Sequence, residues 1–404
     1  MQQIPDTRRY DIDWLRTLAF ILLIFYHIGM FYVVDWGWHV KSAYQSEFLQ
    51  NIMLLVNQWR MPLIFLVSGA ALALVEHKIS ALNLLKLRTA RVFIPLIIGM
   101  YLIVPPQLYY QLIQNNGFTG NYLEFFSFYV DLDTIRYPEQ QSPIGLLTWN
   151  HLWYLPYLFS YTLIYILLKP VFNKIDWQLF AINISPWTIF ILPVSLFIIY
   201  AMFLEPHYPT THALIGDWYN HANSLTSFIF GFLMAKSPSI WSIIIQKRKI
   251  WLGLAVVSYC LIIIRFNRVW EFDISYDEAS SLTQILIQFI WRANSVLWLL
   301  LIIGFSGAYL NRKSRILSYM NEAVLPWYIL HQTVIIVVAM NLAKYSLGGA
   351  IEPLLVTLLT FAVCLVSYEV IKRNNITRFV FGMKLQGNKH QTVLNEEGAS
   401  TSSN

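Results

Sequence analysis

Charged residues are scarce in this chain of 404 residues: they make up 12% of it, whereas hydrophobic residues make up 57%. Soluble domains carry about 25% charged residues, so this balance excludes an ordinary soluble protein. Cysteine is nearly absent as well. Cys260 and Cys364 both lie in apolar stretches, which excludes a disulfide framework and gives no indication of a metal site. No small-residue cleavage site follows the first apolar run, so we expect that run to remain as a helix.

Long apolar runs dominate the rest of the sequence. A run of about 20 residues is long enough to cross a hydrocarbon core about 30 Å thick. The sequence therefore predicts an all-α polytopic membrane protein with about ten spans, at residues 14–34, 51–75, 92–113, 151–171, 186–204, 218–235, 250–266, 283–307, 321–343 and 353–371. Prolines interrupt the fourth and fifth spans, which is tolerated where neighbouring helices satisfy the freed carbonyl groups.

The basic residues are distributed unevenly over the loops. If the N-terminus is cytoplasmic and the spans alternate, 20 of the 28 lysines and arginines fall on the cytoplasmic side and five on the other side. This positive-inside pattern predicts that both termini are cytoplasmic and that the number of spans is even. The net charge of +6 therefore results from the basic residues that set the orientation in the membrane, and we expect no nucleic-acid partner. The pattern is typical of a multi-pass protein of a bacterial inner membrane.

The predicted organisation has three parts. Residues 1–13 form a cytoplasmic N-terminal segment, residues 14–372 a single transmembrane domain, and residues 373–404 a cytoplasmic C-terminal tail. The polar sequence from about residue 387 is expected to be disordered.

The first span, beginning DWLRTLAFILLIFYHIGMFYV, carries Arg16 near its cytoplasmic edge and His27 near the middle of the membrane. Eleven residues are three helical turns, so the two side chains share one face and lie about 16 Å apart along the axis. Asp13 precedes Arg16 by one turn and is placed to orient it. Ionisable groups at this depth usually mark a functional path. His27 is therefore a candidate catalytic residue, and a structural hydrogen bond between helices is the alternative.

The next two spans add further candidates for substrate binding. Arg60 lies in the outer half of the second span, which also contains Ser68 and Gly69, small residues that permit close approach of another backbone. Arg88 and Arg91 lie three residues apart at the cytoplasmic mouth of the third span. At α-helical spacing they share a face and form a natural grip for phosphates, although anchoring at the membrane surface explains them equally well.

Two later spans carry histidines. His151 opens the fourth span in the sequence HLWYL, beside Trp153, and both are candidate substrate-binding residues at the outer edge. His331 lies near the middle of the ninth span in YILHQ and is a second candidate catalytic histidine.

Taken in order along the chain, these motifs resemble the membrane-bound acyltransferase-3 family. The resemblance rests on Arg and His eleven residues apart in the first span, SG in the second, Arg-x-x-Arg before the third, HLWYL and YILHQ. It covers nearly the whole chain, from Arg9 to about Lys384. The stretches RRYDIDWLR, WHVKSA, RMPLIFLVSG and SYEVIKRNNITRFVFG are most similar to family members that succinylate osmoregulated periplasmic glucans.

The resemblance implies an acyltransferase that transfers groups other than aminoacyl groups. The donor is expected to be a cytoplasmic acyl-CoA, carrying succinyl or acetyl, and the acceptor a hydroxyl of a periplasmic carbohydrate. Arg16, Arg88 and Arg91 would then hold the donor phosphates, and His27 would be the reactive imidazole. We expect no permanently bound cofactor and no metal.

Two other points remain open on the sequence alone. A transporter or flippase of a free or lipid-linked saccharide would also contain buried histidines and arginines, although no half-to-half repeat is visible. A homo-oligomer is compatible with the sequence, because a surface that faces lipid and a surface that faces another subunit have the same composition.

Overall fold

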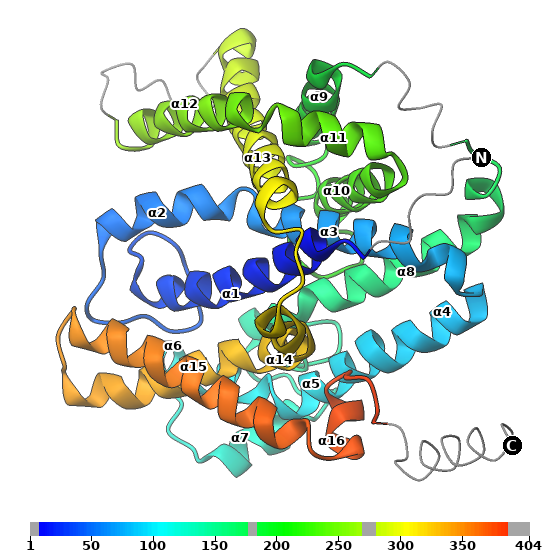
Figure 1. The fold of residues 1–404 in the computed structure, drawn as a ribbon. Helices are drawn as coiled ribbons and strands as arrows, with labels where there is room; N and C mark the ends of the chain where they lie inside the picture. The colour runs from blue at the N-terminus through cyan, green and yellow to red at the C-terminus, as the bar shows by residue number, and fades with distance from the viewer. Residues whose placement is uncertain (1–7, 177–183, 269–279, 387–404) are drawn as a thin grey trace, which may run out of the picture.

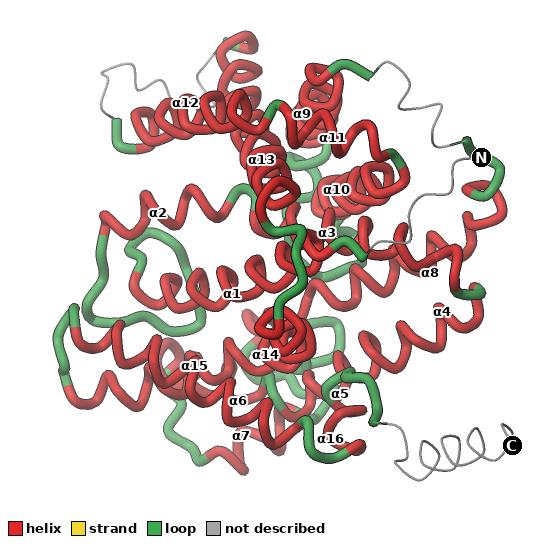
Figure 2. The backbone as a smooth tube through the Cα atoms, viewed as in Figure 1, coloured by secondary structure: helices red, strands yellow, loops and turns green. Residues whose placement is uncertain are grey.

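The computed structural model describes residues 8–176, 184–268 and 280–386. These residues form helices and loops and no strand, apart from two isolated bridges (Figure 2). Nine helical segments among them are long and apolar enough to cross a membrane, and α10 with α11, bent by 99° at their junction, makes a tenth if it counts as one span. The predicted all-α polytopic membrane fold is confirmed. The predicted disordered tail from about residue 387 lies outside the described residues.

The α-helices and their bounds are α1 (Tyr10–Tyr32), α2 (Glu47–Asn57), α3 (Arg60–Val75), α4 (Ala81–Arg88), α5 (Ile94–Leu102), α6 (Pro105–Asn116), α7 (Tyr122–Tyr129), α8 (Tyr154–Phe172), α9 (Pro186–Phe203), α10 (Trp218–Lys236), α11 (Pro238–Gln246), α12 (Arg248–Phe266), α13 (Ser281–Tyr309), α14 (Arg315–Leu342), α15 (Ile351–Ile371) and α16 (Asn375–Val380). Short 3-10 helices cover Glu76–Lys78, Pro138–Gln140, Asn150–Trp153 and Ala343–Tyr345, and a π-helical turn covers Thr89–Phe93. The first helix begins at Tyr10, within the predicted N-terminal segment.

Local sequence signals explain where many helices begin. Several helices are preceded by a serine or asparagine whose side-chain oxygen accepts a hydrogen bond from a backbone N–H of the first turn, as is usual for an N-cap. These caps are Ser46, Ser80, Asn121, Ser185, Ser280 and Asn374. Proline occupies the first position of α6, α9 and α11, where its missing N–H costs no hydrogen bond.

Helix α1 is the centre of the molecule. It packs against α2, α3, α13, α14 and α15, and Figure 1 shows it between α3 on one side and α14 on the other. A helix with protein on several sides meets less lipid, so ionisable side chains on the packed faces of α1 cost less than they would facing lipid.

A tight backbone contact joins α3 to α10. A Cβ added to Gly69 would lie 1.8 Å from the carbonyl oxygen of Phe228, and one added to Gly231 would lie 1.9 Å from the carbonyl oxygen of Leu66. The close backbone approach predicted at Gly69 is therefore confirmed, and another helix, not a ligand, makes it.

We expect Gly69→Ala to destabilise the protein by about 2–3 kcal/mol or more, because the new methyl group would overlap backbone that cannot turn aside. Gly253→Ala is the matched control. Gly253 lies in α12 with open space around its Cα, so the same change there should stabilise the helix slightly. The midpoint of thermal unfolding in detergent measures both. Equal midpoints for the two variants would contradict the close contact.

Candidate active site

Two histidines from distant parts of the sequence meet between α1 and α14. Nδ1 of His27 lies 2.8 Å from Nε2 of His331, and the two rings stack with their centroids 5.0 Å apart. His331 is fully buried, whereas His27 is partly exposed. The sequence singled out both residues, and the structure joins them in one hydrogen bond.

The hydrogen-bond partners fix which nitrogen carries hydrogen. Nδ1 of His331 lies 2.7 Å from the carbonyl oxygen of Tyr328. A carbonyl oxygen only accepts, so this nitrogen donates, and Nε2 of the neutral ring is an acceptor. Nδ1 of His27 therefore donates to His331, and Nε2 of neutral His27 keeps its lone pair. One basic nitrogen, on the partly exposed ring, is left for proton abstraction or nucleophilic attack.

His151 lies behind this pair and supports it. Its ring stands edge-on to His331 with the centroids 5.1 Å apart. Its Nε2 donates to the carbonyl oxygen of Ile329 over 3.0 Å, and its Nδ1 accepts from Nε2 of Gln107 over 3.1 Å. His151 is buried, so the geometry gives it a place in the wall of the site. Within the described residues, no group of three or more His, Cys, Asp or Glu side chains is arranged to hold a metal ion.

Gln107 is a residue that the sequence reasoning missed. Its fully buried amide joins four side chains by hydrogen bonds of 2.7–3.2 Å, those of His151, Thr333, Asn150 and Gln332. Thr333 in turn donates to the carbonyl oxygen of Ile103, where the third span kinks between α5 and α6. A glutamine between two prolines and two tyrosines in an apolar run was the available signal.

The end of the same interface that is predicted to be cytoplasmic holds Arg16. Its Nη2 donates to Asn321 of α14 over 2.9 Å and to Asp13 over 3.1 Å, and Thr17 also donates to Asn321. Arg16 and His27 of α1 thus both meet α14, as their spacing predicts. The charged group and the reactive imidazole lie along one line on the contact between two helices.

A π-helical turn separates Arg88 from Arg91. It covers Thr89–Phe93, so Arg91 lies within it, and it replaces the α-helical geometry that the sequence predicted for this pair. Arg88 lies close enough to Tyr154, Arg91 and Arg16 for their charges to interact. Nε of Arg91 donates to the carbonyl oxygen of Gly382 over 3.0 Å. The three arginines predicted to bind phosphates therefore gather in one region.

Arg60 lies close to the histidines, over the ring of Tyr26. Its guanidinium carbon lies 3.5 Å from the centroid of the Tyr26 ring, and its Nη1 donates to Oδ1 of Asn57 over 2.5 Å. Tyr26 donates to the same oxygen. Nε of Arg60 is buried and has no hydrogen-bond partner among the described residues. The guanidinium is thus held next to His27 with a donor still available.

The aromatic loop after α1 covers His27. The ring of Trp38 is stacked over His27 at 6.5 Å between centroids, and Trp36 lies 6.4 Å from Tyr26. Lys41 fastens the loop to the end of α1 by donating to the carbonyl oxygens of Met30, Val33 and Trp36. Burial lowers the pKa of His39 in this loop, and its Nδ1 donates to Gln111.

Ser68 and Trp153, both predicted to bind substrate, take different positions. Ser68 shares a 2.5 Å hydrogen bond with the hydroxyl of Tyr154, between the arginine region and the histidines. The ring of Trp153 lies against His212 of the loop before α10, tilted by 34° and with the ring centroids 4.1 Å apart. Burial lowers the pKa of His212, so this ring is neutral at pH 7. The structure joins Ser68 to the site and places Trp153 at its outer margin.

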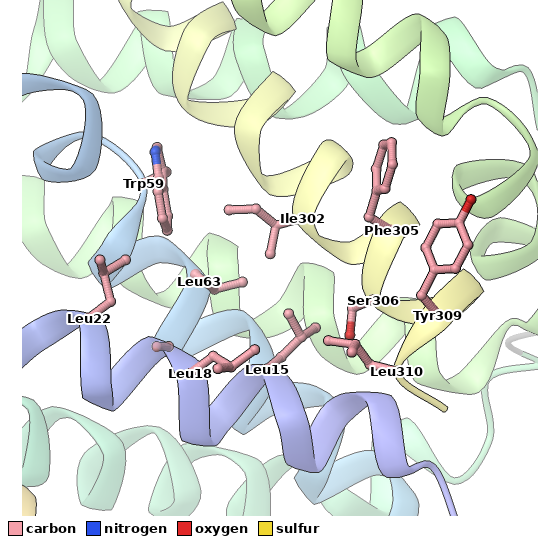
Figure 3. Close-up of a pocket in the computed structure, with 11 residues that line it drawn as sticks. Leu15, Leu18, Leu22, Trp59, Leu63, Ile302, Phe305, Ser306, Tyr309 and Leu310 are labelled. Atoms are coloured by element: carbon pink, nitrogen blue, oxygen red, sulfur yellow. The ribbon is translucent and has the colours of Figure 1, made fainter. Parts of the chain in front are cut away.

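A cavity of about 400 Å³ on another side of α1 has no comparable chemistry. Figure 3 shows aliphatic and aromatic side chains of α1, α3 and α13 around it. Its only polar side-chain groups are the hydroxyls of Ser306 and Tyr309 and the indole of Trp59. This cavity suits hydrocarbon, and the reactive groups lie elsewhere.

Comparison with known proteins agrees with this geometry. The acyltransferase domain model of the acyltransferase-3 family matches residues 9–369. The chain belongs to this family. It is also similar to glucans biosynthesis protein C of Salmonella typhi and of Salmonella typhimurium, with 30% identity over 107 residues in each. That alignment spans 26% of this chain and 28% of each relative. No solved structure matches the chain.

Family membership makes this membrane protein an acyltransferase and thereby favours the enzyme over the transporter. The family match contains every candidate residue named from the sequence, from Asp13 to His331. The structure adds Gln107, Asn321 and Tyr154, which connect those candidates to one another.

We expect Gln107→Met to lower stability by about 2–3 kcal/mol, because it keeps the volume but leaves His151, Asn150 and Gln332 short of a buried partner. Gln114→Met is the matched control, since that amide bonds only to the exposed backbone of Lys41. Thermal unfolding of the two purified variants makes the comparison. A loss no greater for Gln107→Met than for Gln114→Met would count against a central role for this amide.

Proposed function

We propose that the protein transfers an acyl group, succinyl or acetyl, from a cytoplasmic acyl-CoA to a hydroxyl of a periplasmic carbohydrate. The observation that carries the proposal is the His27–His331 pair on the α1–α14 contact, with Arg16 on the same line toward the predicted cytoplasmic end. An acyl-CoA is long, with charged phosphates toward one end and the reactive acyl group at the other. Arg16 and His27, separated along α1, suit these two parts of the donor.

Two observations support a glucan as the acceptor: the name of the similar proteins and the aromatic loop over His27. The name of the similar Salmonella proteins refers to glucans, which supports a glucan acceptor here. Trp36 and Trp38 lie over Tyr26 and His27, and indole rings provide flat apolar surfaces against which a sugar ring can pack. An osmoregulated periplasmic glucan, modified by an enzyme of the inner membrane, fits both points.

In the first of two routes, His27 acts as a general base. Its Nε2 takes the proton of the acceptor hydroxyl while the oxygen attacks the thioester carbonyl carbon. The tetrahedral intermediate then loses the sulfur, and the thiolate takes the same proton from His27 to leave as CoA. His331 accepts the Nδ1–H of His27 throughout, so it orients the ring and stabilises the imidazolium.

In the second route, His27 is the nucleophile. Its Nε2 bonds to the thioester carbon, the C–S bond breaks, CoA leaves as the thiolate, and an acyl-imidazole forms while the Nδ1 proton of His27 passes to His331. The acceptor hydroxyl then attacks the acyl carbon and Nε2 leaves. Nδ1 takes its proton back from His331, and the hydroxyl proton goes to the CoA thiolate. The same hydrogen bond serves both routes, and trapping of an acyl-histidine after acid quenching distinguishes them.

Arg60 has one of two functions in either route. It is a candidate donor for the oxyanion that forms on the thioester carbonyl, because its guanidinium lies over the ring of Tyr26, the residue before His27, and its Nε has no partner among the described residues. It is also a candidate partner for the distal carboxylate of a succinyl group.

Loss of His27 should remove the activity. Purified protein in detergent or proteoliposomes is given labelled succinyl-CoA or acetyl-CoA together with periplasmic glucans. We expect label on the glucan with the parent protein and a decrease in rate of about 100-fold to 10,000-fold with His27→Ala. His207→Ala, a change at an exposed histidine, should keep the parental rate. Transfer by His27→Ala at the parental rate would exclude His27 as base or nucleophile.

Arg60→Gln separates the two functions of Arg60. If Arg60 binds the distal carboxylate, kcat/KM with succinyl-CoA should fall by about 10–100-fold, the worth of a charge-assisted hydrogen bond, and kcat/KM with acetyl-CoA should hardly change. If Arg60 stabilises the oxyanion, both donors should lose rate equally. Equal activity of Arg60→Gln and parent with both donors would contradict both functions.

A further inference from the structure

A polar cavity of about 510 Å³ opens at the predicted cytoplasmic end of the molecule. Three parts of the chain form its wall: Arg91 in the π-helical turn, the first turns of α14, and residues 378–386 after the last span. We call residues 374–386 the C-terminal hook, because they turn back onto the transmembrane body. The hook lies outside residues 9–369, which the family model matches.

Buried polar contacts fix the hook in place. Arg378 is 5% exposed, and its Nη2 donates to Glu322 of α14 over 2.5 Å. Its other nitrogens donate to the carbonyl oxygens of Lys372 and Lys384. The pairing of Arg378 with Glu322 satisfies both charges, so Glu322 does not repel an anion from this cavity.

Gly382 places the hook next to Arg91, one of the arginines proposed to bind the phosphates of the acyl-CoA. Its carbonyl oxygen accepts from Nε of Arg91, and its φ of +65° is one that glycine adopts without strain. A Cβ at this position would lie 2.6 Å from the carbonyl oxygen of Arg91. The hook therefore orients Arg91 and leaves its terminal nitrogens without a hydrogen-bond partner among the described residues.

Asn321 connects the cavity to Arg16. Asn321 lines it and accepts from Arg16, while the Nδ2 of Asn321 is buried without a partner among the described residues. Lys384 lines the cavity and is exposed, so it lies at the rim. Arg91 and Lys384 are therefore both in the wall of the cavity, and Arg16 is one hydrogen bond away through Asn321.

We propose that this cavity binds the 3′-phosphoadenosine end of the CoA donor, with Lys384 facing the 3′-phosphate. The inference rests on the proposed function. In CoA the pyrophosphate lies between the pantetheine arm and the adenosine, so Arg16, Arg88 and Arg91 are placed for the pyrophosphate and the rim for the terminal phosphate. A volume of about 510 Å³ falls within the range of about 300–1,000 Å³ that is usual for cofactor sites.

The test compares two probes, CoA and dephospho-CoA, which lacks only the 3′-phosphate. Their affinities are measured by calorimetry on the full chain in detergent, for the parent and for Lys384→Glu, Lys384→Arg and Lys249→Glu. Lys249 is an exposed lysine of α12 outside the cavity, so its variant carries the same charge change elsewhere. We expect Lys384→Glu to weaken CoA binding at least tenfold and dephospho-CoA binding less than twofold. Lys384→Arg and Lys249→Glu should bind both probes as the parent does.

Each other result overturns the proposal in an identifiable way. Parental CoA affinity in Lys384→Glu, or an equal loss for both probes, removes the 3′-phosphate site and leaves the acyl-CoA donor standing. An equal loss in Lys249→Glu shows that only overall charge matters. A parent protein that binds neither probe and transfers no label from acyl-CoA overturns the donor itself.

Discussion

The structure depends on side-chain hydrogen bonds between α1 and α14. Between two helices in a membrane, polar side chains replace the hydrophobic drive that holds soluble helices together. Here two such contacts occur about ten residues apart, Arg16 with Asn321 and His27 with His331. The side chains that join the two helices are also those that the proposed chemistry needs. The packing of α1 against α14 therefore also forms the site.

Packing around α1 explains why these groups are tolerated. On one side, the backbone contact of α3 with α10 leaves no space for lipid or side chains. On the other, Gln107 satisfies His151, which stands against His331. Buried polar groups are costly when unpaired and specific when fully paired, and this network is paired throughout its centre. The polarity decreases toward the lipid, where the Figure 3 cavity is almost purely apolar.

Much of this could be predicted from the sequence. Hydropathy located every span, because a run of about 20 apolar residues has few alternatives to a membrane helix. Helical periodicity correctly placed Arg16 and His27 on one face. The His27–His331 contact could not be predicted. Helical periodicity shows which side chains of a helix share a face, but it does not show which other helix packs against that face. Gln107 and Asn321 escaped notice since a neutral amide carries little signal in a hydropathy profile. The π-helical turn at Thr89–Phe93 could not be predicted from the α-helical spacing of Arg88 and Arg91.

That turn also determines where the gene can lose a codon. A π-helical turn holds one residue more than an α-helical turn over nearly the same rotation, so deleting a single codon between Thr89 and Phe93 would restore a regular helix and leave the following residues on nearly the same face. A deletion in the regular helix between this turn and Gly99 would instead rotate everything after it by about 100°. Gly99 now lies against Leu152, and a Cβ there would lie 2.6 Å from the Leu152 side chain. After such a rotation another side chain of the span would face Leu152, although the composition of the span would be almost unchanged. The third span can therefore lose a residue within this turn more easily than in the helix that follows it.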